Sequence, residues 1–248
     1  MRRARFIHAC REQWGVVRDD ETIALSDGRE ASLGDVCLLP PVTPGATIFA
    51  LALNYADHSA ELGFKAPEKP LIFLKGPGTF AAHGAAVPRP ADANQMHPEC
   101  ELVAVIGKPA RNIPASRALD VVSSYTVACD YAIREYLENY YRPNFRVKSR
   151  DGCTPLGPWL VDAADIADPQ ALKLTTTVNG IEVQHGHTAD MVFPVADLIA
   201  YLSGFMTLMP GDMILTGTPH GVHFVAAGDT VACEVENVGR LDHRIIAA

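Results

Sequence analysis

His97-Pro98-Glu99-Cys100-Glu101-Leu102 opens the apolar run 102–106, the predicted central strand of the fold. In a β-strand, side chains at positions i and i+2 share a face, so Glu99 and Glu101 would lie roughly 7 Å apart on one side. Two carboxylates beside a buried strand repel each other unless a cation lies between them. A hard, oxygen-preferring ion such as Mg2+ or Mn2+ fits this position. The alternative is a strand whose wet face carries two glutamates by chance.

A third carboxylate decides between these alternatives. Residues 125–129 form an apolar run that predicts a second strand, and Asp130 stands at its end. An ionised aspartate there is difficult to explain as a core residue, which makes it the natural third oxygen ligand. Three carboxylates from two strands therefore favour a metal centre over a chance arrangement.

Composition limits the class of protein. The 248 residues are 48% hydrophobic and 20% charged, which is typical of a globular enzyme with one large core. The net charge of −8 argues against nucleic acid or an anionic membrane as partner, because both attract basic surfaces. The apolar stretches are too short to span a bilayer, and no apolar segment follows the basic start. We therefore expect a cytoplasmic protein that acts on small molecules, with its six cysteines reduced and mostly structural.

The chain divides at a proline-rich segment. Residues 1–45 alternate short β-like pieces with turn signals and predict a small N-terminal β-rich region. The stretch 40–45 contains three prolines and a glycine, and it cannot continue a helix or a central strand. Residues 46–248 are predicted to form a metal-dependent catalytic domain. Its strands at 48–53, 71–74, 213–216, 231–235 and 240–246, with a hairpin turned by Asn179-Gly180, predict a mixed β fold with some α.

A candidate acid–base pair follows the strand at 48–53. If residues 55–62 are helical, His58 and Glu61 lie three apart on one face, so the carboxylate can orient the imidazole and raise its basicity. Such a dyad suits general-base catalysis. The alternative is an exposed helix on which both residues are simply solvated. Lys75, at the end of the strand 71–74, could bind an anion or lie on the surface.

Basic residues cluster in the middle of this acidic chain. Residues 132–141 are predicted to be helical and to end before Pro143. In an extended segment Arg146, Lys148 and Arg150 would share a face, and with Arg142 they would suit a substrate carrying several carboxylates. The alternative is a solvated run of charge.

Two loops contain further polar groups. Backbone N–H groups of residues 217–221 and the Thr218 hydroxyl could hold a carboxylate. His185 and His187 have metal-motif spacing, but imidazole ligands fit an all-carboxylate site poorly, so loop or hydrogen-bonding roles are predicted for them.

Together these motifs resemble the fumarylacetoacetate hydrolase family, from about residue 47 to the end. The resemblance is carried by residues 53–58 (LNYADH), 97–102 (HPECEL), Asp130, 147–152 (VKSRDG), 178–180 (VNG) with Gln184 and Thr188, and 217–219 (GTP). It implies a β-roll core around a divalent ion, Mg2+ or Mn2+, held by Glu99, Glu101 and Asp130. It also implies that His58 and Glu61 lie on a lid-like segment, and that a chain with one such unit forms a homodimer, because known members contain two fused halves.

The resemblance also assigns the remaining roles. It implies catalytic roles for His58, Glu61 and Lys148, and substrate contacts from Tyr55, Lys75, Arg134, Gln184, Thr188, Gly217 and Thr218. Two departures affect the substrate contacts: residues 75–78 are unusually glycine-rich, and His185-Gly186-His187 is atypical.

The implied activity is decarboxylation followed by isomerisation. Residues 131–144 and 205–212 are most similar to members that decarboxylate 5-carboxymethyl-2-oxo-hex-3-ene-1,7-dioate and isomerise 2-hydroxyhepta-2,4-diene-1,7-dioate during the breakdown of 4-hydroxyphenylacetate and homoprotocatechuate. Hydrolysis of an acylpyruvate such as fumarylpyruvate is the first alternative, with His58 activating water, and oxaloacetate decarboxylation is the second. A metal-stabilised binding protein without activity is disfavoured, because it would need neither His58 nor Lys148.

Overall fold

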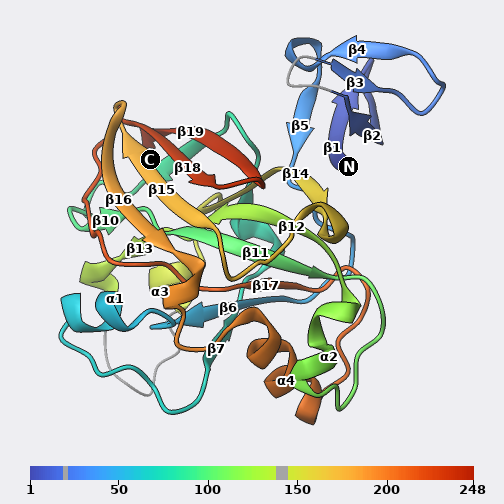
Figure 1. Cartoon of the computed structure of the whole chain (residues 1–248). Coiled ribbons are helices and arrows are strands. Elements are labelled where there is room, and N and C mark those ends of the chain that lie inside the picture. Colours follow the sequence, from blue (N-terminus) through green and yellow to red (C-terminus); the bar gives the residue numbers. More distant parts are fainter. Residues whose placement is uncertain (19–21, 138–144) are drawn as a thin grey trace.

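The computed structural model describes residues 1–18, 22–137 and 145–248 (Figure 1). Its largest sheet contains twelve strands, ten of them in the order β4-β3-β2-β1-β14-β12-β11-β17-β6-β7, while β5 pairs with β1 and β8 with β14. The bounds of these strands are β1 Arg2–His8, β2 Arg11–Val17, β3 Thr22–Ala24, β4 Glu30–Ser32, β5 Cys37–Leu39, β6 Ile48–Ala52, β7 Leu71–Leu74, β8 Phe80–Ala81, β11 Cys100–Ile106, β12 Val122–Cys129, β14 Thr154–Asp162 and β17 Met213–Leu215.

A second sheet and four α-helices are also present in the described residues. The second sheet has the order β16-β15-β18-β19-β9, and a separate ribbon pairs β10 with β13. Their bounds are β9 Ala86–Arg89, β10 Met96–His97, β13 Ala132–Ile133, β15 Lys173–Val178, β16 Ile181–His187, β18 Thr230–Val235 and β19 Gly239–Ala247. The α-helices are α1 Ala56–Glu61, α2 Ala115–Ala118, α3 Phe145–Lys148 and α4 Val195–Phe205. The predicted mixed β fold with some α is confirmed.

The N-terminal strands form the predicted β-rich appendage. In Figure 1 the blue strands β1–β4 project away from the rest of the molecule. They enclose a small core of their own around Phe6 and Ile23. The start of β1 continues into the body, where Arg2 pairs with Val161 and Arg3 with Leu160 of β14.

The central strands position the predicted carboxylates. Every residue of β11 is buried, because β12 and β17 flank it on both sides and other elements cover its faces. The β11–β12 register pairs Cys100 with Cys129. This pairing places Glu99 and Asp130 next to each other, and the Asp130 N–H donates to the Glu99 carbonyl over 2.9 Å. The fold therefore brings together carboxylates that lie about thirty positions apart in the sequence.

The β15–β16 hairpin is confirmed where Asn179-Gly180 predicted it. Both turn residues have positive φ, 51° and 79°, which is the backbone conformation that an Asn-Gly turn supplies at low cost. On the opposite side of the molecule, α2 packs against α4 (Figure 1).

Two predictions around residue 140 are wrong where they can be compared with the structure. Residues 132–136 form β13 and a 3-10 turn rather than a helix, because the buried Ala132 and Ile133 pair with His97 and Met96. Residues 145–148 form the helix α3 rather than an extended segment. The remainder of the predicted helix, and Arg142, lie outside the described residues.

Two further features concern the cysteines and the helices. All six cysteines are free thiols, and four of them are buried. Within the described parts of the chain, no helix is long and apolar enough to cross a membrane.

Candidate active site

The three predicted carboxylates meet in the core. One oxygen from each of Glu99, Glu101 and Asp130 lies within 4.8 Å of the others, and all three residues are buried. Glu101 and Asp130 are completely inaccessible to solvent, a position that ionised carboxylates occupy only when paired or bound to a metal. The predicted cluster is therefore present, and its donor set is the one preferred by Mg2+ or Mn2+.

Two buried lysines face this triad. Lys148 Nζ donates to Glu99 Oε2 and lies 3.1 Å from Asp130 Oδ2. Burial lowers the pKa of Lys148, but the charges of Asp130, Glu99 and Glu101 outweigh it, so the pKa is raised and the ammonium group persists. Lys75 Nζ donates to Asp130 Oδ1 over 2.7 Å and also to the Lys148 carbonyl oxygen. Its side chain is 0% exposed, so the alternative of a surface lysine is wrong.

Two carboxylate oxygens of the triad lack a hydrogen-bond donor among the described residues. These are Glu101 Oε1 and Asp130 Oδ2, although the latter has Lys148 nearby. The other oxygen of Glu101 accepts from the Gly217 N–H over 2.6 Å. Burial, reinforced by the Asp130 charge, raises the pKa of Glu101 well above its usual range. Glu101 Oε1 is thus a buried carboxylate oxygen whose ionised form a bound cation would stabilise, so the residues present suit a divalent metal.

Arg134 and His97 complete one side of the triad. Arg134 Nε donates to His97 Nε2 over 2.8 Å, and one terminal nitrogen donates to Glu99 Oε1 over 3.2 Å. Burial lowers the pKa of His97 to about 3, so its ring is neutral and can accept the Arg134 proton. Arg134 therefore binds Glu99, which is a candidate metal ligand. The predicted contact of Arg134 with the substrate stays a prediction. Sequence reasoning quoted His97 but missed this contact, because its partner lies 37 positions away.

The predicted dyad is formed by α1. His58 Nδ1 lies 3.1 Å from Glu61 Oε2, and the His58 side chain is only 5% exposed. Burial raises the pKa of Glu61, but the N–H groups of Val222 and Gly221, together with His58, outweigh it and lower the pKa. An ionised Glu61 can only accept, so the His58 proton resides on Nδ1 and the Nε2 lone pair is available to a reactant. The alternative of a simply solvated helix is wrong for His58.

A loop that follows β17 fixes the position of this helix. The Val222 N–H donates to Glu61 Oε1 over 2.9 Å. His220 lies on the same carboxylate, with Nε2 3.5 Å from Oε1, while its backbone N–H donates to Asp57 Oδ2. Sequence reasoning predicted that backbone N–H groups of this loop could hold a carboxylate, but it did not identify the contact of the His220 ring with Glu61.

The other predicted substrate residues lie around the same loop and strands. Gln184 donates from Nε2 to Thr218 Oγ1 over 3.0 Å and accepts at Oε1 from Thr176. The Thr188 hydroxyl accepts from the Leu172 N–H over 2.9 Å. The Tyr55 hydroxyl is buried without a hydrogen-bond partner in the described structure. Their substrate roles stay predictions.

The two histidines of β16 have the loop and hydrogen-bonding roles predicted for them. His187 Nδ1 accepts from the Ala189 N–H, and His185 is 82% exposed beside Glu182. Gly186 between them packs on Pro219, since a Cβ at this position would lie 2.4 Å from the Pro219 Cβ. The atypical glycine is therefore explained by a close approach to the loop at 217–219.

The basic cluster is divided by the helix α3. Lys148 points into the triad, whereas Arg146 and Arg150 lie over the Tyr136 ring at 4.1 and 5.3 Å. The prediction that Arg146, Lys148 and Arg150 share one extended face is wrong, because one helical turn directs Lys148 away from its neighbours.

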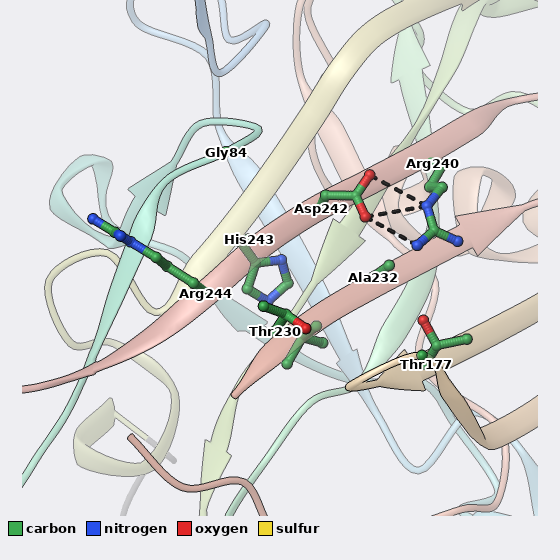
Figure 2. Close-up of a pocket in the computed structure, with 10 residues that line it drawn as sticks. Gly84, Thr177, Thr230, Ala232, Arg240, Asp242, His243 and Arg244 are labelled. Carbon is green, nitrogen blue, oxygen red and sulfur yellow. Dashed lines mark hydrogen bonds and ion pairs between the residues drawn. The ribbon is translucent and has the colours of Figure 1, made fainter. Parts of the chain in front are cut away.

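Two cavities lie away from the triad. One of about 300 Å3 lies over β15, β18 and β19, and Figure 2 shows Arg240 paired there with Asp242. Another of about 630 Å3 lies between the N-terminal appendage and Trp159. Neither contains a predicted catalytic residue.

Comparison with known proteins identifies the family. A model for the C-terminal part of fumarylacetoacetate (FAA) hydrolase matches residues 47–246. The chain is 55% identical over 206 residues to the 4-hydroxyphenylacetate degradation bifunctional isomerase/decarboxylase of Salmonella dublin, a match that covers 83% of this chain and 48% of that protein. The Escherichia coli protein of the same name is 58% identical over 204 residues, with 82% and 48% covered. The chain thus spans about half the length of these curated relatives.

Solved structures agree with this match. The structure of 5-carboxymethyl-2-hydroxymuconate delta-isomerase from Mycobacterium smegmatis superimposes with a TM-score of 0.88 at 35% identity, covering 100% of this chain and 99% of that one. Maleylpyruvate hydrolase from Sphingobium sp. SYK-6, in complex with manganese(II) ion and pyruvate, gives a TM-score of 0.84 at 28% identity, with both chains fully covered. The resemblance inferred from the sequence is confirmed: the chain belongs to the fumarylacetoacetate hydrolase family.

Proposed function

We propose that the chain is a divalent-metal-dependent decarboxylase and isomerase of 4-hydroxyphenylacetate catabolism. Its substrates would be 5-carboxymethyl-2-oxo-hex-3-ene-1,7-dioate and then 2-hydroxyhepta-2,4-diene-1,7-dioate. The observation that carries the proposal is the buried triad of Glu99, Glu101 and Asp130, with two oxygens that lack hydrogen-bond donors among the described residues. The 55% and 58% identities to bifunctional isomerase/decarboxylases support this choice of substrates.

Glu99, Glu101 and Asp130 would hold the ion, for which we propose Mg2+, with Mn2+ as substitute. When bound, the ion supplies a Lewis acid that stabilises negative charge on the oxygens of a 2-oxo acid. Manganese in the related maleylpyruvate hydrolase structure supports a divalent ion in this family.

The buried cations would handle the charges of the substrate. Loss of CO2 breaks one C–C bond, whose electron pair moves through the conjugated double bond onto the 2-oxo oxygen. Lys148 keeps its positive charge in the core and would stabilise the negative charge that develops there. Arg134 donates from Nε to His97 and from one terminal nitrogen to Glu99. Because a guanidinium has five N–H donors, others remain for a substrate carboxylate.

His58 would move protons in both reactions. Each decarboxylation consumes one proton and yields the 2-hydroxy-2,4-diene. Isomerisation then removes the 2-hydroxyl proton and adds a proton at carbon 5 to give the 2-oxo tautomer. Because Glu61 fixes the proton of the His58 ring on Nδ1, the Nε2 lone pair can accept the hydroxyl proton and return it to carbon.

Hydrolysis of an acylpyruvate is the second candidate function. The observation that favours it is the same His58–Glu61 dyad, which could deprotonate a water molecule.

The test is an assay of substrate preference. Purified protein with Mg2+ would be given a panel of 2-oxo di- and tricarboxylates and acylpyruvates, while CO2 release and ultraviolet absorbance are followed. The proposal expects the tricarboxylate and the 2-hydroxy diene to give the highest kcat/KM, and activity to disappear in EDTA. An acylpyruvate with the highest kcat/KM, whose turnover His58→Ala abolishes, would establish the hydrolase instead.

We further propose a cytoplasmic homodimer that binds a small 2-oxo acid. The support for self-association is length: the chain covers 48% of relatives that carry both activities, so two copies would match one such relative. Light scattering of the purified protein would measure its mass against the monomer.

A further inference from the structure

Asn54 joins three separate parts of the chain at the edge of the candidate site. Its side chain is buried, with 1% of the residue exposed, and it directly follows Leu53, whose φ of 59° is rare for a residue with a side chain. Nδ2 donates to the Phe193 carbonyl over 3.1 Å and to the Thr216 carbonyl over 2.7 Å, and Oδ1 accepts from the Phe193 N–H over 2.9 Å. The side-chain amide thus links the end of β6 to Phe193 and to the end of β17.

The link to Thr216 continues to a metal-ligand candidate. Gly217 has a φ of 87°, and a Cβ there would lie 2.9 Å from the Asn54 Cβ, so the two backbones are in close contact. The N–H of Gly217 donates to Glu101 Oε2 over 2.6 Å. This bond occupies one Glu101 oxygen, while Oε1 has no donor in the described chain.

We propose that Asn54 is a positioning residue for the Glu101 carboxylate. By holding the Thr216 carbonyl, Asn54 fixes the left-handed turn at Gly217, and this turn directs the N–H that orients Glu101 towards the other two carboxylates. The proposal rests on the metal centre of the proposed function and adds to it the residue that sets the geometry of one ligand.

Only an amide satisfies this position. The site requires two N–H donations and one acceptance, which match the NH2 and C=O groups of asparagine. Aspartate would lose both donors and place a negative charge facing two carbonyl oxygens. Alanine would leave the buried Thr216 carbonyl and two half-buried backbone groups of Phe193 without this partner.

Metal affinity measured by calorimetry is the test, because it needs no substrate. Outer partners of metal ligands typically contribute 10–100-fold to affinity, so Asn54→Ala and Asn54→Asp should weaken Mn2+ or Mg2+ binding by roughly that factor. The conservative Asn54→Ser, which retains one hydroxyl, should lose less, and it keeps the test possible if the alanine variant does not fold. In turnover assays the loss should be recovered by raising the metal concentration.

Asn179 supplies the matched control. It lies in the exposed hairpin turn, where its amide also makes two hydrogen bonds. The amide donates to Asp229 Oδ1 over 2.8 Å and accepts from the Thr230 N–H over 3.0 Å. Asn179→Ala should lower Tm without changing metal affinity. Metal binding by Asn54→Ala as tight as in the wild type would overturn the proposal, as would an equal loss in Asn179→Ala.

A double variant tests the route through Gly217. Gly217→Ala should weaken metal binding by itself. The double variant with Asn54→Ala should lose less metal affinity than the product of the two single fold-losses, because both substitutions act on one turn. Fully multiplicative losses would overturn this route. Failure of the proposed function is separate: a wild-type protein that binds metal but converts no 2-oxo acid would refute the activity and leave the Asn54 measurement intact.

Discussion

The metal centre and the acid–base dyad are built in different ways. Glu101 lies within β11, in the middle of the large sheet, and Glu99 and Asp130 flank the paired ends of β11 and β12. His58 and Glu61 instead come from the six-residue helix α1, which Glu61 and Asp57 attach to backbone N–H groups of residues 220–222. The carboxylates can move only if the core opens, whereas the helix is held by a few hydrogen bonds. The ion site should therefore be rigid, and the dyad should be a unit that opens locally.

The largest loss of activity is expected from a substitution in the metal centre. Glu101→Gln removes a charged ligand but keeps the shape of the strand, and it should abolish measurable turnover. Loss of an outer partner alone typically costs about 10–100-fold, and loss of a ligand should exceed that. Calorimetry of Mg2+ binding and turnover with and without EDTA would measure both. Glu182→Gln, an exposed carboxylate on β16, is the control. Equal activity in EDTA and in Mg2+ would refute the metal centre.

The next effect should separate the two regions. His58→Ala should slow disappearance of the 2-hydroxy diene by about 10²–10⁴-fold, the usual contribution of a general acid–base group. CO2 release should fall less, because its electron pair is stabilised at the triad, and Mg2+ affinity should stay at the wild-type value. Parallel calorimetry and absorbance assays would show this division. A large loss of Mg2+ affinity in His58→Ala would mean that the dyad and the metal centre are one structural unit.

A smaller effect is expected at Glu61. Glu61 accepts from the Val222 N–H at Oε1 and faces His58 at Oε2, whereas glutamine keeps only one carbonyl acceptor and loses the charge. Hydrogen bonds to charged groups exceed neutral ones by about 1 kcal/mol, so Glu61→Gln should lower kcat for isomerisation by roughly 5–10-fold. If its kcat fell as far as that of His58→Ala, Glu61 would be a proton carrier rather than an orienting group.

The smallest effect is a pH dependence of the attachment of α1. The pKa of Glu61 is lower in the folded protein than its usual value of 4.5, so its contribution to attachment is fully present above that pH. It is lost as the pH falls through the lower folded pKa. Hydrogen exchange at the Val222 amide, corrected for the intrinsic rate, should therefore accelerate in acid. Glu61→Gln should remove this dependence, and an equal pH dependence in that variant would assign the effect to another group.

The same contrast explains which parts of the structure were predictable from the sequence. Sequence patterns predicted the strands at 48–53, 102–106 and 125–129 and the hairpin at Asn179-Gly180. They could do so because the alternation of apolar residues, apolar runs and turn residues are local signals. The spacing of Glu99 and Glu101 places both on one face of a strand, and Asp130 ends the next strand. The triad was therefore within reach of sequence reasoning.

Contacts between distant segments were not predictable. Residues 132–136 are rich in residues that favour helices, yet burial of Ala132 and Ile133 against β10 decides their conformation, since tertiary packing overrides propensity. The pairing of Arg134 with His97, and that of Lys75 with Asp130, depend on partners 37 and 55 positions away. No local pattern encodes such distances.

The charges around the triad have a consequence for binding order. Three carboxylates face two buried ammonium groups and the guanidinium of Arg134, so these charges cancel when all three carboxylates are ionised, as a bound cation would require. A divalent cation would leave a surplus of two positive charges in a medium of low dielectric constant, and a doubly charged anion would cancel it. Ion and substrate would therefore each raise the affinity of the site for the other, and thermodynamic linkage requires the two enhancements to be equal.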